Sequence, residues 1–217
     1  MPVTDPRIRY ETFEFSGVDI HVRALRDRQE FSDDEGTAET LGIGSADWAF
    51  FGVVWECGRA LARLMSDFPI EGRSVLEVGC GIGLASLVLN KRLVNITATD
   101  HHPDGEAFLL LNCALNEGPP VPFVRCGWTD LKSVLPRFDL IIGSDLLYQR
   151  DHAKELSKFV DLHAHPKSEV IIVDPGRGEC ARFSRHMAES GYRSASLPLR
   201  SSDTEAGFSG RYLHYLR

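Results

Sequence analysis

Three glycines, Gly79, Gly81 and Gly83, stand at alternate positions after a short apolar run over 74–78. Such a run is typical of a buried parallel strand. Glycine allows the backbone to turn at positive φ and lets a ligand lie against bare main chain. Apolar residues at helical spacing follow, so we predict a helix that begins near Gly83. Its free N–H groups would face the crevice in which open α/β sheets bind their ligands.

The spacing of these glycines and one acid distinguish between two nucleoside cofactors. Dinucleotide sites use G-x-G-x-x-G, whose third glycine lets helix and strand pack around a pyrophosphate. Here the third position is Leu84 or Ser86, depending on the register. Glu77 would repel a pyrophosphate, whereas it suits a cationic ligand, directly or through a water. We therefore predict S-adenosyl-L-methionine, which carries an ammonium and a sulfonium and no phosphate, rather than a nicotinamide dinucleotide.

A second acid, Asp100, closes the next apolar run, over 95–100. A carboxylate at the end of the second strand of a nucleoside-binding sheet can accept both ribose hydroxyls. Taken alone, the glycine loop is also compatible with an ordinary turn. The loop, the helix and Asp100 together favour a nucleoside site.

Bulk properties narrow the class of protein. The chain has 217 residues, a length sufficient for one α/β domain with a substantial core. Its formal net charge is −7. No Lys/Arg cluster interleaves with aromatic residues, so we expect no nucleic-acid partner. No stretch approaches the roughly 18 apolar residues of a membrane span, so we expect no membrane partner. We expect a monomer.

The thiols and imidazoles do not suggest a metal centre. The five cysteines are scattered and form no C-x-x-C pair, so we expect reduced thiols in a cytoplasmic protein. The pairs His101-His102 and His163-x-His165 are interpreted as surface or hydrogen-bonded histidines. We therefore expect no metal site.

The elements around these residues alternate between strand and helix patterns from position 74 onward. Strands are predicted at 74–79, 95–100, 122–127, 138–144 and 169–174, and helices at 84–92, 104–116, 151–163 and 178–190. Two short alternating runs, 194–199 and 211–216, supply the last two strands, with 201–210 as a tip between them. Buried helix faces are assigned to Phe108, Leu111 and Leu115, and to Leu156, Phe159 and Val160. This order predicts a Rossmann-like seven-stranded, mostly parallel sheet with helices on both faces.

The first 69 residues are predicted to cap that sheet. Alternation over 10–25 with a Ser16-Gly17 turn predicts a β-hairpin. The polar stretch 26–47 is a loop that either gates the cleft or is disordered. An amphipathic helix then runs from Val54 to the stop at Phe68-Pro69. We interpret 1–217 as a single domain, with 1–69 as the cap and 70–217 as the Rossmann-like core.

Several further motifs join the glycine loop along the chain. They are Val54-Trp55, Glu77 to Gly83, Thr99-Asp100, Asn112 with Asn116, Gly127-Trp128, and Phe138 to Tyr148, which contains Asp145-x-x-Tyr148. Together they resemble the seven-strand (class I) S-adenosylmethionine-dependent methyltransferases, and within them the lysine-methyltransferase-like group with the D-x-x-Y signature. The resemblance covers roughly Trp48 to Tyr192.

The resemblance implies a role for each matching residue. The implied cofactor contacts are Trp55 on the N-terminal side, Glu77, Gly79, Cys80, Gly81 and Gly83 around the methionine part, Asp100 on the ribose, Trp128 beside the adenine, and Ser144 at the end of the fourth strand. The implied acceptor slot is lined by Asp145 and Tyr148. Each residue also has a plainer interpretation. Trp55 and Trp128 are then core aromatics, Asp145 a turn residue or helix cap, and Tyr148 a packed tyrosine.

The chemistry of methyl transfer fits these residue types. Transfer from a sulfonium is an in-line displacement, so the enzyme mainly aligns two atoms in a dry cleft. A lysine acceptor must be neutral to attack, yet its free pKa is about 10.4. The sulfonium disfavours a second nearby cation, which helps the amine to lose its proton. Asp145 would orient the nitrogen and Tyr148 would wall the slot, and neither is assigned as a general base.

The sequence leaves three hypotheses about the function and the methyl acceptor. The first is a methyltransferase acting on a protein side chain, foremost lysine. The second changes the acceptor to a small amine or a nicotinamide-like compound, because Asp174-Pro175-Gly176-Arg177 is more similar to bacterial small-amine methyltransferases, with Asp174 facing the substrate. The third is a non-catalytic scaffold, which predicts damage to the loop or to Asp145, and both are intact.

Overall fold

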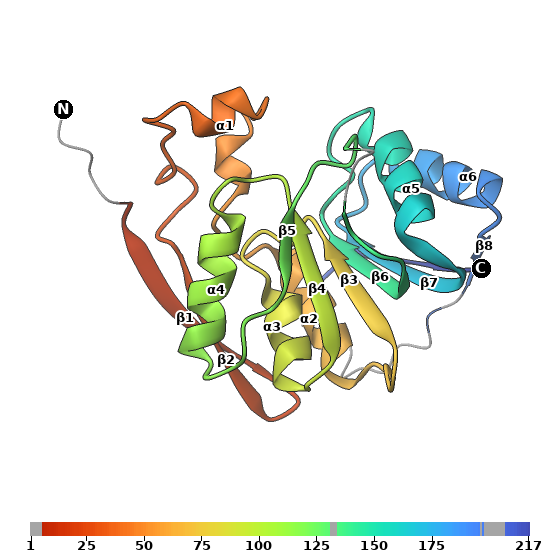
Figure 1. The fold of residues 1–217 in the computed structure, drawn as a ribbon, viewed down its shortest axis with the longest axis horizontal. Coiled ribbons are helices and arrows are strands. Elements are labelled where there is room, and N and C mark those ends of the chain that lie inside the picture. The colour runs from red at the N-terminus through yellow and green to blue at the C-terminus, as the bar shows by residue number, and fades with distance from the viewer. Residues whose placement is uncertain (1–5, 131–133, 196, 198–206) are drawn as a thin grey trace.

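A seven-stranded sheet forms the centre of the molecule (Figure 1). The computed structural model describes residues 6–130, 134–195, 197 and 207–217. The strands are β3 (Ser74–Val78), β4 (Asn95–Asp100), β5 (Phe123–Arg125), β6 (Phe138–Ser144), β7 (Ala164–Asp174), β8 (Arg193–Ser194) and β9 (Arg211–Leu216). Their order is β5-β4-β3-β6-β7-β9-β8. Only β9 runs antiparallel to its neighbours, so the predicted mostly parallel, Rossmann-like sheet is confirmed.

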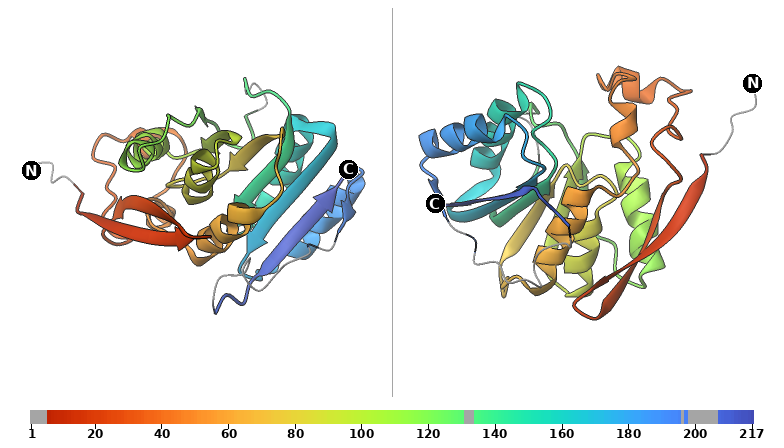
Figure 2. Two further views of the ribbon diagram at one scale, coloured as in Figure 1. Left: turned by 90° about the horizontal axis from the view of Figure 1, so that it is seen from below. Right: turned by 180° about the vertical axis from the view of Figure 1, so that it is seen from behind.

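Successive residues of the central strands point to opposite faces of the sheet and enter two separate cores. Val75 contributes to a core with α2 (Glu56–Asp67), α3 (Leu84–Lys91) and α4 (Gly105–Leu115). Leu76, its neighbour, contributes to a second core with α5 (His152–His163) and α6 (Cys180–Glu189). Figure 2 shows the two helical layers on either side of the sheet. This arrangement explains the consecutive apolar residues within β3, β6 and β7.

The N-terminal hairpin forms its own two-stranded sheet, β1 (Ile8–Phe15) and β2 (Val18–Leu25). Two asparagines of α4 pair with its backbone. Asn112 Oδ1 accepts a hydrogen bond from Arg23 N at 2.7 Å, and its Nδ2 donates to Arg23 O at 3.2 Å. Asn116 repeats this with His21 N and O, at 2.8 and 2.6 Å. These side chains therefore act like a neighbouring strand and hold the hairpin on α4.

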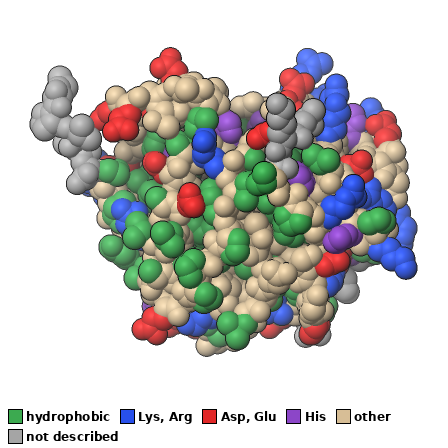
Figure 3. Space-filling view, in the orientation of Figure 1, with side chains coloured by type: hydrophobic (Ala, Val, Ile, Leu, Met, Phe, Trp, Pro, Cys, Tyr) green, Lys and Arg blue, Asp and Glu red, His purple; other side chains and the backbone are tan. Residues whose placement is uncertain are grey.

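The predicted buried face of α4 is partly wrong. Phe108 is buried as expected, but Leu111 and Leu115 are 48% and 37% exposed. Asn112 instead points inward toward the hairpin, which turns those leucines to the surface. Figure 3 shows apolar side chains on the part of the surface that carries α4, whereas Lys and Arg side chains gather beside α5 and α6. The predicted buried face of α5, in contrast, is confirmed.

Several predicted boundaries also change. The stretch 26–47 contains a short helix, α1 (Thr37–Thr40), whose first turn donates to the carboxylate of Asp33. β7 begins five residues earlier than expected because Ala164 already pairs with Phe138. The run 194–199 supplies only the end of β8, and position 196 and positions 198–206, which include most of the predicted tip, lie outside the described residues.

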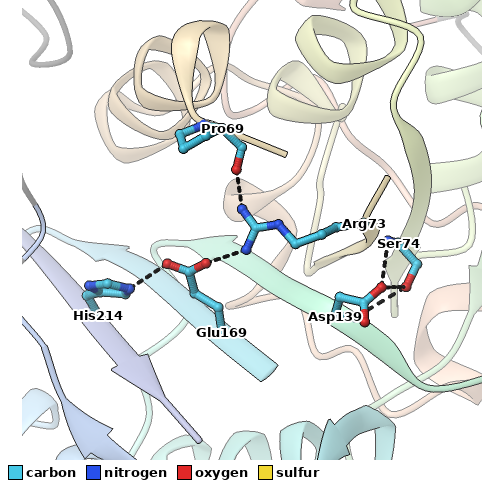
Figure 4. Close-up of polar contacts among 6 residues, drawn as sticks. All are labelled: Pro69, Arg73, Ser74, Asp139, Glu169 and His214. Carbon is cyan, nitrogen blue, oxygen red and sulfur yellow. Dashed lines mark hydrogen bonds and ion pairs between the residues drawn. The ribbon is translucent and has the colours of Figure 1, made fainter. Parts of the chain in front are cut away.

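A polar network links the segment before β3 to β7 and β9 (Figure 4). Arg73 bonds to Glu169 Oε2 at 2.5 Å and to the carbonyl of Pro69, and His214 Nε2 bonds to Glu169 Oε1 at 2.6 Å. Burial raises the pKa of Glu169, but the hydrogen bonds from His214 and Arg73 outweigh it and leave that pKa lowered. The network joins the α2–β3 connection to β7 and β9, and leaves the carboxyl ends of the strands open for a ligand.

Candidate functional site

A cavity of about 350 Å³ lies at the carboxyl ends of β3, β4 and β6. Its volume falls within the roughly 300–1,000 Å³ that is typical of small-molecule sites. The structure brings ten of the predicted site residues together in its lining: Trp55, Glu77, Gly79, Cys80, Gly81, Asp100, Trp128, Ser144, Asp145 and Tyr148. Gly83, the eleventh, is not among the described residues that line it.

Two of the glycines have different reasons to be glycine. Gly81 has φ +56°, and a Cβ there would meet no atom within 4 Å, because it would point into open space. Gly83 has φ +78° and is the N-cap of α3, and a Cβ there would lie 2.5 Å from Leu109 Cδ1. Gly81 therefore keeps bare backbone at the cavity, whereas Gly83 allows α3 and α4 to pack closely.

Glu77 is a buried carboxyl group at the end of β3, only 3% exposed. Its Oε2 accepts hydrogen bonds from Ser86 N at 2.8 Å and from Ser86 Oγ, while Oε1 has no hydrogen-bond partner among the described residues. Burial raises the pKa of Glu77 to about 7, against the lowering effect of the Ser86 bonds. The group therefore braces the first turn of α3 and keeps one oxygen for a ligand of the cavity.

Asp100 braces the glycine loop from the neighbouring strand. Its Oδ2 accepts a hydrogen bond from Gly81 N at 2.7 Å, and its Oδ1 accepts one from His102 N at 2.8 Å. Burial raises the pKa of Asp100, and these backbone hydrogen bonds oppose the rise. The carboxylate thus fixes the shape of the loop, in addition to the ribose contact that stays a prediction.

Aromatic rings form a continuous wall along one side of the cavity. Phe50 lies 6.2 Å from Trp55 and 4.9 Å from Tyr148, between ring centroids. His152 continues the wall, 4.5 Å from Tyr148 and 5.0 Å from Trp128. Both tryptophans therefore line the cavity, and Trp128 in addition packs against the second core. Burial raises the pKa of the Tyr148 hydroxyl to about 12, so it remains a neutral phenol.

Asp145 has a backbone conformation that is rare outside glycine, with φ +58°. It directly follows β6, and its N–H donates to Val173 O at 2.8 Å, which extends the β6–β7 ladder by one residue. It is not a helix cap, because Asp151 is the N-cap of α5. Strained residues of this kind cost about 1–3 kcal/mol and cluster at functional sites. Ser16, Leu93 and Glu117 also have positive φ, but of these four described residues only Asp145 lines the cavity, which makes it a better functional candidate than its sequence pattern alone indicated.

The loop before α2 forms part of the wall, with residues that the sequence analysis did not single out although it offered the cleft as one place for 26–47. Gly42, Ile43 and Asp47 line the cavity, and Gln149 Nε2 donates to Asp47 Oδ1 at 3.2 Å. The signal for this contribution was the aromatic run Trp48-Ala49-Phe50-Phe51, in which Trp48–Phe50 form a 3-10 helix, η1.

His102 lies beneath that segment rather than at the surface. Its ring stacks on Phe51 at 3.6 Å between centroids. Burial lowers the pKa of His102 to about 3, so the ring is neutral at physiological pH and completes the apolar support of the N-terminal wall.

The structure also corrects the expectation that Asp174 faces the substrate. Asp174 is fully buried, and its Oδ1 accepts hydrogen bonds from Gly176 N and Arg177 N at 2.7 and 2.8 Å. Arg177 lines the cavity instead and forms an ion pair with Asp145. The turn after β7 therefore presents an arginine to the site, not a carboxylate.

In the part of the chain that the structure describes, no helix is both long and apolar enough to cross a bilayer. No group of three or more His, Cys, Asp or Glu side chains there is arranged to hold a metal ion.

Curated proteins that are similar to this chain carry the names of protein methyltransferases. The electron transfer flavoprotein beta subunit lysine methyltransferase of Xenopus laevis is 32% identical over 178 residues, 77% of this chain and 66% of that protein. The protein N-lysine methyltransferase METTL21A of Danio rerio is 30% identical over 142 residues, 59% of this chain and 63% of that protein. The matches thus span less than two thirds of the length of either relative.

Solved structures agree on the fold. The ribosomal protein L11 methylase from Lactobacillus delbrueckii subsp. bulgaricus superposes with a TM-score of 0.59 at 20% identity, covering 77% of this chain and 80% of that one. In addition, residues 45–189 match the family model described as lysine methyltransferase. Because that match spans more than half of the sequence, this chain belongs to the lysine methyltransferase family.

Proposed function

We propose that this chain transfers the methyl group of S-adenosyl-L-methionine to the side-chain nitrogen of a lysine in a protein. The observation that carries the proposal is the position of Asp145. It is held at positive φ beside Tyr148, in a cavity that also contains the glycine loop. The names of two similar curated proteins, the electron transfer flavoprotein beta subunit lysine methyltransferase and METTL21A, support the lysine acceptor, whereas another similar protein is named a histone-arginine methyltransferase.

The cavity fits a cationic nucleoside cofactor. Bare backbone at Gly81 gives close access to the main chain, and Glu77 offers Oε1 to an ammonium group. We propose that the methionine part lies against Gly79, Cys80 and Gly81, and the ribose against Asp100. Gly83 then acts through the start of α3 rather than by contact. When bound, S-adenosyl-L-methionine supplies a methyl group on a positively charged sulfur.

The remaining lining residues fit the nucleoside and the acceptor. We propose that Trp128 lies beside the adenine and that Trp55 and Ser144 flank the cofactor. Asp145 orients the acceptor nitrogen, and the ring of Tyr148 excludes water from it. Because burial raises the pKa of Tyr148 to about 12, its phenol does not act as a base at neutral pH. The acceptor proton leaves to solvent before transfer.

A macromolecular acceptor is consistent with the open rim of the cavity. Phe50 and Tyr148 are 42% and 39% exposed, so a side chain carried on another protein can reach them. The five cysteines are buried thiols, which supports the proposal that the protein works in a reducing compartment such as the cytoplasm. A monomeric state also stays a proposal.

A label-transfer assay tests the proposed function. The protein is incubated with methyl-labelled S-adenosyl-L-methionine and a cell extract, and the products are separated by size. Asp145→Asn is the informative variant, because asparagine tolerates the left-handed conformation, and Asp151→Asn at the exposed start of α5 is its matched control. We expect label in one or a few protein bands with the parent and with Asp151→Asn, and at least tenfold less with Asp145→Asn. Label confined to small molecules would contradict a protein acceptor.

A further inference from the structure

Arg177 is the cation of an otherwise acidic cavity. Among the described residues that line it, five carry a carboxyl group and Arg177 is the one lysine or arginine; the carboxyl groups are those of Asp47, Glu77, Asp100, Asp145 and Glu155. The Arg177 guanidinium pairs with Asp145 Oδ1. This pair places the arginine on the residue that is proposed to orient the acceptor.

The turn after β7 holds Arg177 in this position. Asp174 is fully buried. Its Oδ1 accepts hydrogen bonds from Gly176 N, Arg177 N and, at 3.0 Å, Cys180 Sγ. β6 and β7 are adjacent and parallel, with Ser144 paired to Val173. The aspartate after one strand and the arginine after the other are therefore fixed by neighbouring strand ends.

A carboxylate without a partner would oppose methyl transfer to an amine. It would stabilise the ammonium form of the acceptor, raise the acceptor pKa and lower the fraction that can attack. A guanidinium paired to that carboxylate cancels most of its charge, while one carboxylate oxygen still accepts a hydrogen bond from a neutral amine.

We propose that Arg177 is a positioning residue that neutralises the charge of Asp145, so that the acceptor slot holds a neutral amine and excludes an ammonium. This inference rests on the proposed function. It identifies the acceptor form that the site takes and gives the turn after β7 a part in the reaction.

Other titratable groups that face the pair come from several elements. Asp47 lies before η1, Tyr148 follows β6, and His152 and Glu155 lie on α5; these four line the cavity. At the turn after β7, the buried Asp174 lies near Cys57 of α2 and Cys180 of α6, two thiols whose pKa burial raises to about 12. Arg211 of β9 is paired with Asp174 in the β7–β9 ladder and is a second cation near this turn. The thiols are therefore neutral, and the remaining carboxylates add to the field that Arg177 offsets. Glu77 and Asp100 lie farther along the cavity floor, at the glycine loop.

The pH dependence of methyl transfer tests this role. The substrate is the protein that the parent labels, and the variants are Arg177→Gln, Arg177→Lys and, as control, Arg182→Gln, whose arginine pairs with Glu179 outside the cavity. For Arg177→Gln we expect the midpoint of the kcat profile to rise by about 1–3 pH units. At pH 7.5, kcat then falls at least tenfold while KM for the acceptor is unchanged or lower. Arg177→Lys restores the parent midpoint, and Arg182→Gln does not move it.

Two results would overturn the inference. One is a midpoint that stays in place or moves down in Arg177→Gln. The other is a shift in Arg177→Lys as large as that in Arg177→Gln, which would mean that the shape of arginine matters and its charge does not.

A binding measurement separates this inference from the proposed function. n-Butylamine, whose ammonium copies the end of lysine, is titrated by NMR against the protein saturated with S-adenosylhomocysteine. At pH 7.5, we expect Arg177→Gln to bind the amine at least tenfold more tightly than the parent does. Equal affinities, or no binding to either, would overturn the role of Arg177, whereas a parent that labels no protein contradicts only the proposed function.

Discussion

Glu77→Gln tests whether the buried carboxyl under the glycine loop is held there at a cost in stability. Glutamine keeps an oxygen that accepts from Ser86 N but carries no charge. Burial raises the pKa of Glu77 from 4.5 to about 7. In the cofactor-free protein, that shift means that ionised Glu77 lowers the free energy of unfolding by roughly 3 kcal/mol.

The sign of the pH dependence follows from the raised pKa. Between pH 4.5 and about 7 the folded state holds a proton on Glu77 that the unfolded state has lost. The cost of Glu77 is therefore absent below that window and complete above it. The free energy of unfolding of Glu77→Gln, minus that of the parent, should rise through the window by about 3 kcal/mol and then stay constant.

Urea unfolding of the cofactor-free proteins from pH 4.5 to 8.5 measures this difference. Glu106→Gln, on the exposed side of the first turn of α4, is the matched control and should not show a rise of that size. A flat or falling difference for Glu77→Gln would refute the reasoning. At pH 8 the same variant should bind S-adenosyl-L-methionine at least tenfold more weakly, because it removes the carboxylate proposed to face the ammonium group.

The remaining predictions concern the loop and the hairpin. Gly81→Ala should weaken cofactor binding at least tenfold in calorimetry, because its Cβ enters the cavity. Its free energy of unfolding should fall by only about 1–2 kcal/mol, because alanine is strained at positive φ. The free energy of unfolding of Gly83→Ala should fall further, by about 2–4 kcal/mol, because overpacking against Leu109 adds to the same strain. Asp100→Ala should weaken cofactor binding by about 1–3 kcal/mol for lost hydrogen bonds to a charged group. Asn112→Ala should cost about 1–3 kcal/mol of stability in urea unfolding, because two backbone groups of the hairpin lose their partner.

Each of these predictions has a contrary result. Equal losses of stability in Gly81→Ala and Gly83→Ala would remove the distinction between the two glycines. Unchanged cofactor affinity in Asp100→Ala would take that residue out of the site. A loss of cofactor affinity above threefold in Asn112→Ala would mean that this asparagine, which also donates to Ile82 O at 3.4 Å, shapes the glycine loop as well as holding the hairpin.

The order of strands and helices could be predicted from local patterns, because each central strand is a short apolar run with a turn signal after it. The pairing of Asn112 and Asn116 with the hairpin could not. These asparagines lie 89 and 95 positions from their partners, and nothing in a helical pattern distinguishes such a residue from a surface one. The exposed leucines of α4 were assigned inward for the same reason.

The glycine loop and its two acids could be located because their chemistry depends on residue type and spacing. The positive φ of Asp145 and its ion pair with Arg177 could not, because both arise where β6 and β7 end side by side. Only some residues of the aromatic wall could be predicted from the sequence. Trp55, Trp128 and Tyr148 belong to motifs, whereas Phe50 in η1 and His152 at the start of α5 reach the cavity only through the packing of elements that are distant in sequence.

The most direct test of the central claim is to locate the transferred methyl group. The protein that the parent labels in extract is isolated, digested and sequenced by tandem mass spectrometry, with the Asp145→Asn reaction as reference. The account predicts the mass increment of methyl groups on the side-chain nitrogen of a lysine, absent from the reference. Methyl groups found on another type of residue, or present equally in the reference, would contradict it.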